Sequence, residues 1–193
     1  IQMLNMLENF EIASMERNST EFVHMLTEIQ RLAYADRAIH LGDPDFYPSP
    51  VPMLISKEYA KKRLGLISMD KATPSSEIAA GSTIPESMET THYSAMDKFG
   101  NTVGITTTIN LSFGNKKIVD GAGFLLNNEM DDFASSPGSQ NAFGLIGYEA
   151  NSIKPAKRPL SSMSPTIVLS PEGEPLMTIG AAGGSRIITT VLQ

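Results

Sequence analysis

Threonine recurs on both sides of one predicted turn in this sequence. Thr90 and Thr91 follow a polar stretch that ends at Glu89, and the run "TTTIN" places Thr108 a short distance downstream. A threonine hydroxyl is a poor nucleophile unless a base lies beside it, and an N-terminal threonine obtains that base from its own α-amino group. The free α-amine has a pKa of about 7.7–8.0, so a useful fraction is unprotonated near neutral pH. An enzyme of this kind must be made as a precursor and cut immediately before the threonine.

The residues before Thr90 have the composition that such a cut requires. The stretch "MDKATPSSEIAAGSTIPESME" is rich in Ser, Thr, Pro, Gly and Ala and has no sustained hydrophobic period. It predicts an exposed, cleavable loop over about residues 70–89, with Glu89–Thr90 as the cleavage site. Two plainer interpretations remain open at this point, because the stretch resembles an interdomain linker and threonine is a common strand residue.

The first third of the sequence predicts helices. Phe22, Leu26, Ile29 and Ala33 recur at helical spacing after a cap at Asn18 or Ser19. The segment "HLGDPDFYPSPVP" then breaks the pattern with a glycine and four prolines. Ser56 is expected to cap a short helix with the sequence "KEYAKKRLGLI".

From Thr90 onward the sequence predicts antiparallel hairpins. "THYSAMD" and "TVGITTTINL" flank the turn "KFGN", and "SPTIVLS" and "PLMTIG" flank the turn "PEGE". "GAAGGSRIITTVLQ" is typical of a strand end, a glycine loop and the start of a helix. Helices followed by hairpins and a further helix favour an α+β fold over a doubly wound parallel sheet.

The bulk composition excludes several function classes. The 193 residues are 41% hydrophobic and 19% charged, and the formal net charge of −6 comes without a basic cluster for nucleic acid. The absence of cysteine excludes disulfides, thiolate metal sites and cysteine nucleophiles. No apolar run approaches the length of a transmembrane helix, and no histidine–carboxylate cluster predicts a metal site.

His24 and His40 fit structural roles, and His92 shares the face of Thr90 without a reason to contact its hydroxyl. The sequence at both ends is already in helical rhythm, so we expect a fragment of a longer protein.

Five stretches from Thr90 onward resemble one enzyme family. "TTHYSAMDKFGN", "TTTIN", "FLLNNEMDDF", "KRPLSSMSPTIV" and "GAAGGSRIITTVLQ" match, in order, the small subunit of γ-glutamyltranspeptidase, an N-terminal-nucleophile hydrolase. "LAYADRAIHLGDPDF" resembles the end of that family's large subunit. The resemblance implies residues 1–89 as the end of the large subunit and residues 90–193 as the start of the small, catalytic one. It further implies the four-layer αββα sandwich of this hydrolase class, incomplete in this chain.

The resemblance also assigns roles to residues. Thr90 would be the nucleophile, the Thr108 hydroxyl would hydrogen-bond to it, and backbone N–H groups of Gly183 and Gly184 would hold the oxyanion. The residues that would bind the α-amino and α-carboxylate ends of the substrate are Asn110, Glu129, Asp132, Ser161 and Ser162. Each has a plainer reading, since "NNEMDD" suits an acidic turn and "GAAGGS" a tight glycine turn.

Three departures from the family pattern bear on the site. Position 129 carries Glu where some bacterial members carry Gln, and either can accept from an ammonium group. Phe143 stands in the loop expected to form a lid, where many bacterial relatives place Tyr, so a lid hydrogen bond from that hydroxyl would be lost. The family's arginine clamp for the α-carboxylate is expected upstream, outside this chain.

The resemblance implies a γ-glutamyl acyltransferase and hydrolase that acts on glutathione and cleaves itself before Thr90. Water, an amino acid or a dipeptide would accept the γ-glutamyl group, the missing large- and small-subunit segments would be partners, and no metal or organic cofactor would be required. Bacterial members are usually periplasmic or secreted, and we expect the same here. The alternatives are a related enzyme that acts on poly-γ-glutamate or acylates other amines, and an inactive fragment that is never processed.

Overall fold

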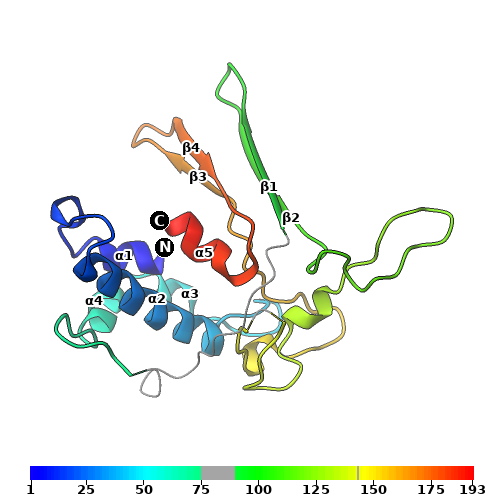
Figure 1. Ribbon diagram of the computed structural model, residues 1–193, viewed down its shortest axis with the longest axis horizontal. Helices are drawn as coiled ribbons and strands as arrows, with labels where there is room; N and C mark the ends of the chain where they lie inside the picture. The colour runs from blue at the N-terminus through cyan, green and yellow to red at the C-terminus, as the bar shows by residue number, and fades with distance from the viewer. Residues whose placement is uncertain (75–89, 143) are drawn as a thin grey trace. The chain divides into compact units, whose positions relative to one another are not determined.

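A computed structural model describes residues 1–74, 90–142 and 144–193 of the chain, which fold as two compact units. The described part of the first unit consists of residues 1–74, Ala134–Ser139 and Ile146–Arg158. The second consists of residues 90–133, 140–142, 144–145 and Pro159–Gln193. The first unit contains helices and the second contains both hairpins (Figure 1), so the described residues form a mixed α/β fold with small sheets.

Four helices build the first unit: α1 (Gln2–Leu7), α2 (Thr20–His40), α3 (Val51–Leu54) and α4 (Lys57–Leu64). Both predicted caps are confirmed, because the hydroxyls of Ser19 and Ser56 accept from the first turns of α2 and α4 at 3.2 Å and 3.1 Å. Helix α4 is shorter than the sequence predicts, since it ends at Leu64. Gly65 follows as its cap, and glycine is a poor residue for continuing a helix.

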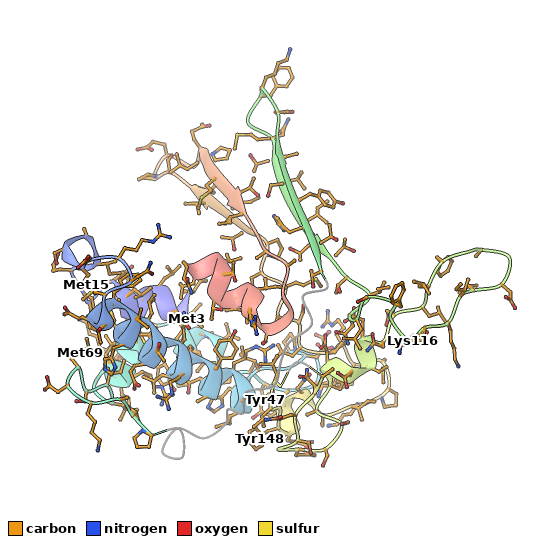
Figure 2. All side chains as sticks on the ribbon, viewed as in Figure 1. Met3, Met15, Tyr47, Met69, Lys116 and Tyr148 are labelled. Atoms are coloured by element: carbon orange, nitrogen blue, oxygen red, sulfur yellow. The ribbon has the colours of Figure 1, made fainter. Side chains whose placement is uncertain are left out.

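The core of the first unit combines apolar packing with one buried polar cluster. Helix α1 packs against α2 and α4, and its Met3, Met6 and Leu7 are buried (Met3 is labelled in Figure 2). The buried carboxylate of Asp36 on α2 accepts from Gln2 at 2.6 Å and from the Tyr59 hydroxyl at 3.1 Å. These bonds join three helices through one side chain, which satisfies a charge that would otherwise be costly to bury.

Gly42 marks a close backbone approach in the first unit. A Cβ at this position would overlap the carbonyl oxygen of Ala150, which belongs to the 3₁₀ turn Glu149–Asn151. The loop after α2 therefore packs directly on a segment more than a hundred residues away in sequence, and only glycine leaves the space for it.

We expect Gly42→Ala to destabilise the full-length protein that contains this chain. Because the obstacle is a backbone atom, the loop has to move, and overpacking of this kind costs about 1–3 kcal/mol in the free energy of unfolding. Gly65→Ala is the matched control, since Gly65 already has helical backbone angles (φ −62°) and the new Cβ would lie 3.3 Å from the Lys62 carbonyl oxygen. In urea unfolding, Gly42→Ala should have a lower midpoint than the wild type, and Gly65→Ala should not. A Gly42→Ala midpoint equal to that of the wild type would show that the close contact does not affect stability.

Two antiparallel hairpins and one helix build the second unit: β1 (Thr91–Met96) with β2 (Thr102–Thr107), β3 (Thr166–Leu169) with β4 (Pro175–Ile179), and α5 (Ile187–Leu192). Both predicted hairpins are confirmed, with shorter strands. Strand β1 begins one residue after Thr90, and β2 ends at Thr107, before Asn110 takes a positive φ of 75° that an extended strand cannot contain.

The two hairpins pack on each other within the second unit. Thr178 on β4 donates to the hydroxyl of Ser94 on β1 at 3.2 Å. Opposite Ser94, Gly104 on β2 leaves room for this contact, because a Cβ there would lie 2.8 Å from the Thr178 hydroxyl oxygen. The pairing brings the glycine loop that follows β4 into the same unit as the start of β1.

Among the described helices, none has both the length and the apolar character needed to cross a lipid bilayer.

Candidate active site

The register of the first hairpin brings the two predicted catalytic threonines together. Thr91 pairs with Thr107 and Met96 with Thr102, so one further step along the same register sets Thr90 opposite Thr108. The Asp97 carboxylate fixes the turn by accepting from the backbone N–H groups of Phe99 at 2.8 Å and Asn101 at 3.0 Å. A hydrogen bond from the Asn101 side chain, with these backbone bonds, holds the pKa of Asp97 below its ordinary value. The fixed length of the turn therefore brings Thr90 and Thr108 to the same end of the hairpin, where both line one pocket.

A pair of asparagines fastens the end of β2 to the loop that carries the acidic residues. The buried Asn110 donates its side-chain amide to the Asn128 carbonyl at 3.0 Å, and the Asn128 side chain accepts from the Leu111 N–H at 3.1 Å. The Thr108 hydroxyl oxygen accepts from the Asn110 N–H at 2.9 Å. These bonds stabilise the left-handed backbone of Asn110, a conformation that asparagine tolerates better than most residues.

The acidic residues lie on a single 3₁₀ turn, Glu129–Asp132, immediately after Asn128. Partial burial raises the pKa of Glu129, and a hydrogen bond with the Asp132 carboxyl group opposes this shift. Burial disfavours the charged form of a carboxyl group, so Glu129 retains a proton to higher pH than an exposed glutamate would. The turn combines a negative charge with a hydrogen-bonding carboxyl group, which suits an ammonium ligand.

Ser161 and Ser162 lie on the extended segment that enters β3. The Ser161 hydroxyl accepts from the Met163 N–H at 3.1 Å, and the Ser162 carbonyl accepts from the Ser164 hydroxyl at 3.1 Å. These bonds fix the local backbone, so both serines are held in place before any ligand binds.

Two successive glycines with positive φ link β4 to the final helix. Gly183 has φ 125° and Gly184 has φ 54°, after which the 3₁₀ turn Gly184–Arg186 leads into α5. An L side chain rarely adopts a φ of 125°, so Gly183 is required by its backbone conformation. Ser185 and Ile187 are buried beyond the glycines, which anchors the loop.

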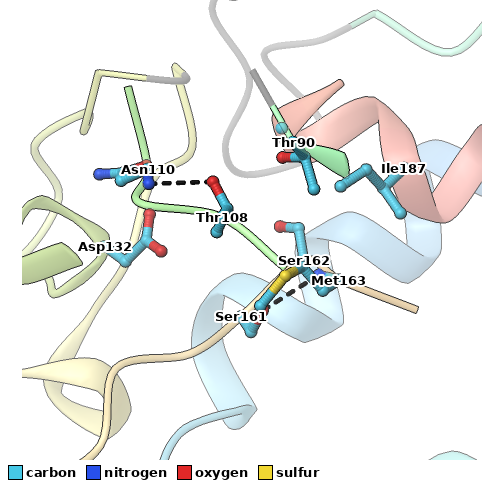
Figure 3. Close-up of a pocket in the computed structure, with 9 residues that line it drawn as sticks. Thr90, Thr108, Asn110, Asp132, Ser161, Ser162, Met163 and Ile187 are labelled. Carbon is cyan, nitrogen blue, oxygen red and sulfur yellow. Dashed lines mark hydrogen bonds between the residues drawn. The ribbon is translucent and has the colours of Figure 1, made fainter. Parts of the chain in front are cut away.

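These elements converge on one small pocket in the second unit, whose empty space is about 310 Å³ when the open solvent at its mouth is included. Figure 3 shows Thr108, Asn110 and Asp132 on one side of the pocket and Thr90 and Ile187 on the other. Of the predicted site residues, seven line it: Thr90, Thr108, Asn110, Asp132, Ser161, Ser162 and Gly184. Met163 and Ile187 also line it and were not predicted; their adjacency to Ser162 and to the glycine loop is the only signal the sequence offers.

Four predicted site residues are not among the residues that line the pocket. Glu129 is tied to the pocket through Asp132, and Gly183 directly precedes the lining residue Gly184. Glu89 and Phe143, predicted as the cleavage position and the lid, lie outside the described residues.

His92 is hydrogen-bonded within the first hairpin and packs against the end of the second. Its Nδ1 lies 2.8 Å from the Thr106 hydroxyl and its Nε2 lies 2.9 Å from the Ser94 hydroxyl. The backbone of Gly180 packs on the imidazole so closely that any Cβ there would overlap the ring. His92 is therefore a structural residue between the nucleophile strand and the start of the glycine loop.

The residues that line the pocket suit acyl transfer. They combine two hydroxyls at a strand end, a carboxyl group, two serines and a glycine loop around one small space. Within the described residues, no group of three or more His, Asp or Glu side chains could hold a metal ion.

This chain belongs to the gamma-glutamyltranspeptidase family, whose family model matches residues 1–193. It is 50% identical to a glutathione hydrolase proenzyme of Escherichia coli strain K12, over 100% of this chain and 33% of that protein. It is 40% identical to the Acylase ACY 1 proenzyme of Pseudomonas sp. strain SE83, over 100% of this chain and 32% of that protein. A solved structure of an acivicin-inhibited gamma-glutamyltranspeptidase matches with a TM-score of 0.52 and 60% identity, over 53% of this chain and 54% of that one.

These matches confirm the resemblance seen in the sequence and establish the family. The chain spans about a third of the length of the curated relatives it matches.

Proposed function

We propose that the complete protein is a γ-glutamyl acyltransferase and hydrolase that acts on glutathione and related γ-glutamyl compounds. The observation that carries this proposal is the pocket in which Thr90, Thr108, Asp132 and Gly184 come together from four separate segments. The names of the relatives support it, because the E. coli protein is called a glutathione hydrolase and a proenzyme.

The proposed maturation step uses Thr90 against its own peptide bond. The Thr90 hydroxyl attacks the Glu89 carbonyl carbon, the C–N bond breaks, and the nitrogen takes up the hydroxyl proton beside its own hydrogen to become a free α-amine. The resulting ester is hydrolysed by water, which leaves a carboxylate on Glu89 and restores the Thr90 hydroxyl. The product carries its own general base, because an N-terminal amine with a pKa of about 7.7–8.0 can accept the hydroxyl proton.

In the mature enzyme, Thr90 attacks the γ-carbonyl of the donor. Backbone N–H groups of Gly183 and Gly184 stabilise the oxyanion, and the amine leaves with the proton taken from Thr90. Water then releases glutamate from the acyl-enzyme, or an amino acid or dipeptide takes the γ-glutamyl group. Asp132 and Glu129 bind the substrate's α-ammonium, while Asn110, Ser161 and Ser162 donate to its α-carboxylate.

The remaining parts of the enzyme belong to segments beyond this chain. We place residues 1–89 in the large subunit and residues 90–193 in the small one, within a four-layer αββα sandwich that other segments complete. A periplasmic or secreted location follows from the same family resemblance.

A second candidate function has one observation in its favour. The Acylase ACY 1 proenzyme is 40% identical over the whole chain, so the same machinery could serve an amide whose acyl group is not γ-glutamyl.

The experiment is to purify the full-length protein, determine its intact mass and N-terminal sequences, and incubate it with glutathione. We expect two chains, one beginning at Thr90, and release of glutamate. Glutathione and simple N-acyl amines are compared side by side to separate the two candidates. Glutamate release by a protein whose Glu89–Thr90 bond is unbroken would overturn the proposed function.

A further inference from the structure

The first unit is built from both sides of the proposed cleavage site. Its helices come from residues 1–74, but Ala134–Ser139 and Ile146–Arg158 belong to the same unit. A cut before Thr90 would assign these two segments to a different chain from the helices on which they pack. The unit would then become an interface between two products, and the contacts that cross from one product to the other would hold it together.

Arg158 forms ion pairs between those two groups of residues, with Asp43 and with Asp45. Arg158 donates to the Asp43 carboxylate through its backbone N–H at 2.8 Å, Nε at 2.9 Å and Nη2 at 2.5 Å. The two guanidinium bonds form a fork on the two carboxylate oxygens, which is the strongest geometry for an arginine–carboxylate pair. Arg158 Nη2 also contacts the Asp45 carboxylate at 2.5 Å.

The burial of Asp43 makes Arg158 hard to replace. The Asp43 side chain is 1% exposed, whereas that of Arg158 is 66% exposed. Three of the four hydrogen bonds that the Asp43 carboxylate accepts come from Arg158, and the fourth comes from the Asp45 N–H at 3.1 Å. Hydrogen bonds from Arg158 hold the pKa of Asp43 far below its ordinary range. If Arg158 left, the buried charge would keep a single donor, and an uncompensated buried charge is strongly unfavourable.

The immediate surroundings of the pair are tightly packed. Gly42, the residue before Asp43, lies against the Ala150 carbonyl oxygen, and that oxygen also accepts from the buried ammonium group of Lys157 at 2.9 Å. Asp43 and Arg158 therefore sit beside a close backbone contact that excludes water from the carboxylate. A pair in such a place is worth more than one between two exposed side chains.

We propose that the Asp43–Arg158 pair is an ionic staple that holds the two products of chain cleavage together. This inference rests on the proposed function, since only cleavage before Thr90 places the two residues on separate chains. In the precursor the same pair joins two parts of one chain. The covalent link keeps these parts together even when the pair is lost. After cleavage it acts between two molecules, and its loss appears as dissociation.

The test uses the full-length protein after processing. Dissociation of the two products is followed by size-exclusion chromatography and native mass spectrometry in increasing urea, for the wild type and for Arg158→Ala. We expect Arg158→Ala to weaken the association at least about tenfold. Added salt should weaken the association of the wild-type products toward that of the Arg158→Ala products, because salt screens a partly exposed ion pair. The association of the Arg158→Ala products themselves should not change with salt.

Two further variants separate the staple from general effects. Lys57→Gln removes the Lys57–Glu8 pair (2.7 Å), which lies in the same unit with both partners on one side of the cleavage site. It should leave the association unchanged. Thr90→Ala/Arg158→Ala, which stays uncut, should remain a folded single species. If Arg158→Ala prevents folding, Arg158→Lys is compared with the wild type instead. It keeps the positive charge but loses the forked pair of hydrogen bonds to the Asp43 carboxylate.

The outcomes decide the proposal independently of the proposed function. Products of Arg158→Ala that associate as tightly as the wild type, or an equal loss in Lys57→Gln, would overturn the staple. A wild-type protein that is never cut would overturn the proposed function instead. A specific-protease site inserted between Glu89 and Thr90 then generates the same two pieces, and the association is measured on them.

Discussion

Thr90→Ala is expected to leave the full-length precursor as one uncut chain and to lower γ-glutamyl hydrolysis by about a thousandfold or more, as removal of a nucleophile does. Alanine removes the oxygen that attacks the Glu89 carbonyl and the oxygen that forms the acyl-enzyme, so both reactions fail together. Thr90→Ser should keep both reactions at reduced rates, because serine retains the hydroxyl and, once cut, the α-amine. Intact mass and glutamate release from glutathione measure the two effects.

Thr91→Ala is the matched control for Thr90. The two threonines are adjacent, but successive residues of a strand point to opposite faces, and Thr91 is exposed. We expect the control to be cut and to remain active within about twofold, because exposed strand positions away from a site have small effects. Cleavage of Thr90→Ala at the same bond would disprove the role of Thr90 in maturation, and full activity of that variant would disprove its role in turnover.

Local features of this fold were predictable from residue types. Caps were predicted at Asn18 or Ser19 and at Ser56, because such side chains satisfy the exposed N–H groups of a helix start, and Ser19 and Ser56 do so. The hairpins followed from alternating strands around short polar turns. The ends of the helices and strands were predicted less accurately. The positive φ of Asn110, which follows the end of β2, depends on its bond to Asn128, eighteen residues away.

The candidate site was predictable in part because family motifs carried it. Thr108 and Ser162 were named from short stretches of sequence, and both line the pocket with Thr90. Met163 and Ile187 were missed, since an apolar residue beside a motif has no chemical signature and only the packed structure shows which way it faces. The assignment of Ile146–Arg158 to the helical unit was equally invisible, because Asp43 and Arg158 meet across 115 positions of sequence.

Gly183→Ala is expected to lower kcat for glutathione hydrolysis by about a hundredfold to a thousandfold while KM changes little, the loss typical of an oxyanion donor. The added Cβ meets no close obstacle, since its nearest neighbour would be the Arg186 Cβ at 3.8 Å. The cost comes from φ 125°, which alanine cannot adopt without strain, so the loop must turn and carry the N–H of Gly184 away from the pocket. The effect falls on kcat because the oxyanion exists only as the amide is attacked.

Gly173→Ala separates this effect from the general cost of replacing a glycine with positive φ. Gly173 has φ 91° in the turn between β3 and β4, and nothing lies within 4 Å of a Cβ placed there. Both substitutions therefore strain a backbone without a clash, but Gly173 is absent from the residues that line the pocket. Gly173→Ala should lower stability slightly and leave kcat within about twofold. Equal kcat values for the two variants would show that the Gly183–Gly184 loop does not stabilise the transition state, and the serine and threonine hydroxyls around Thr90 would have to do so instead.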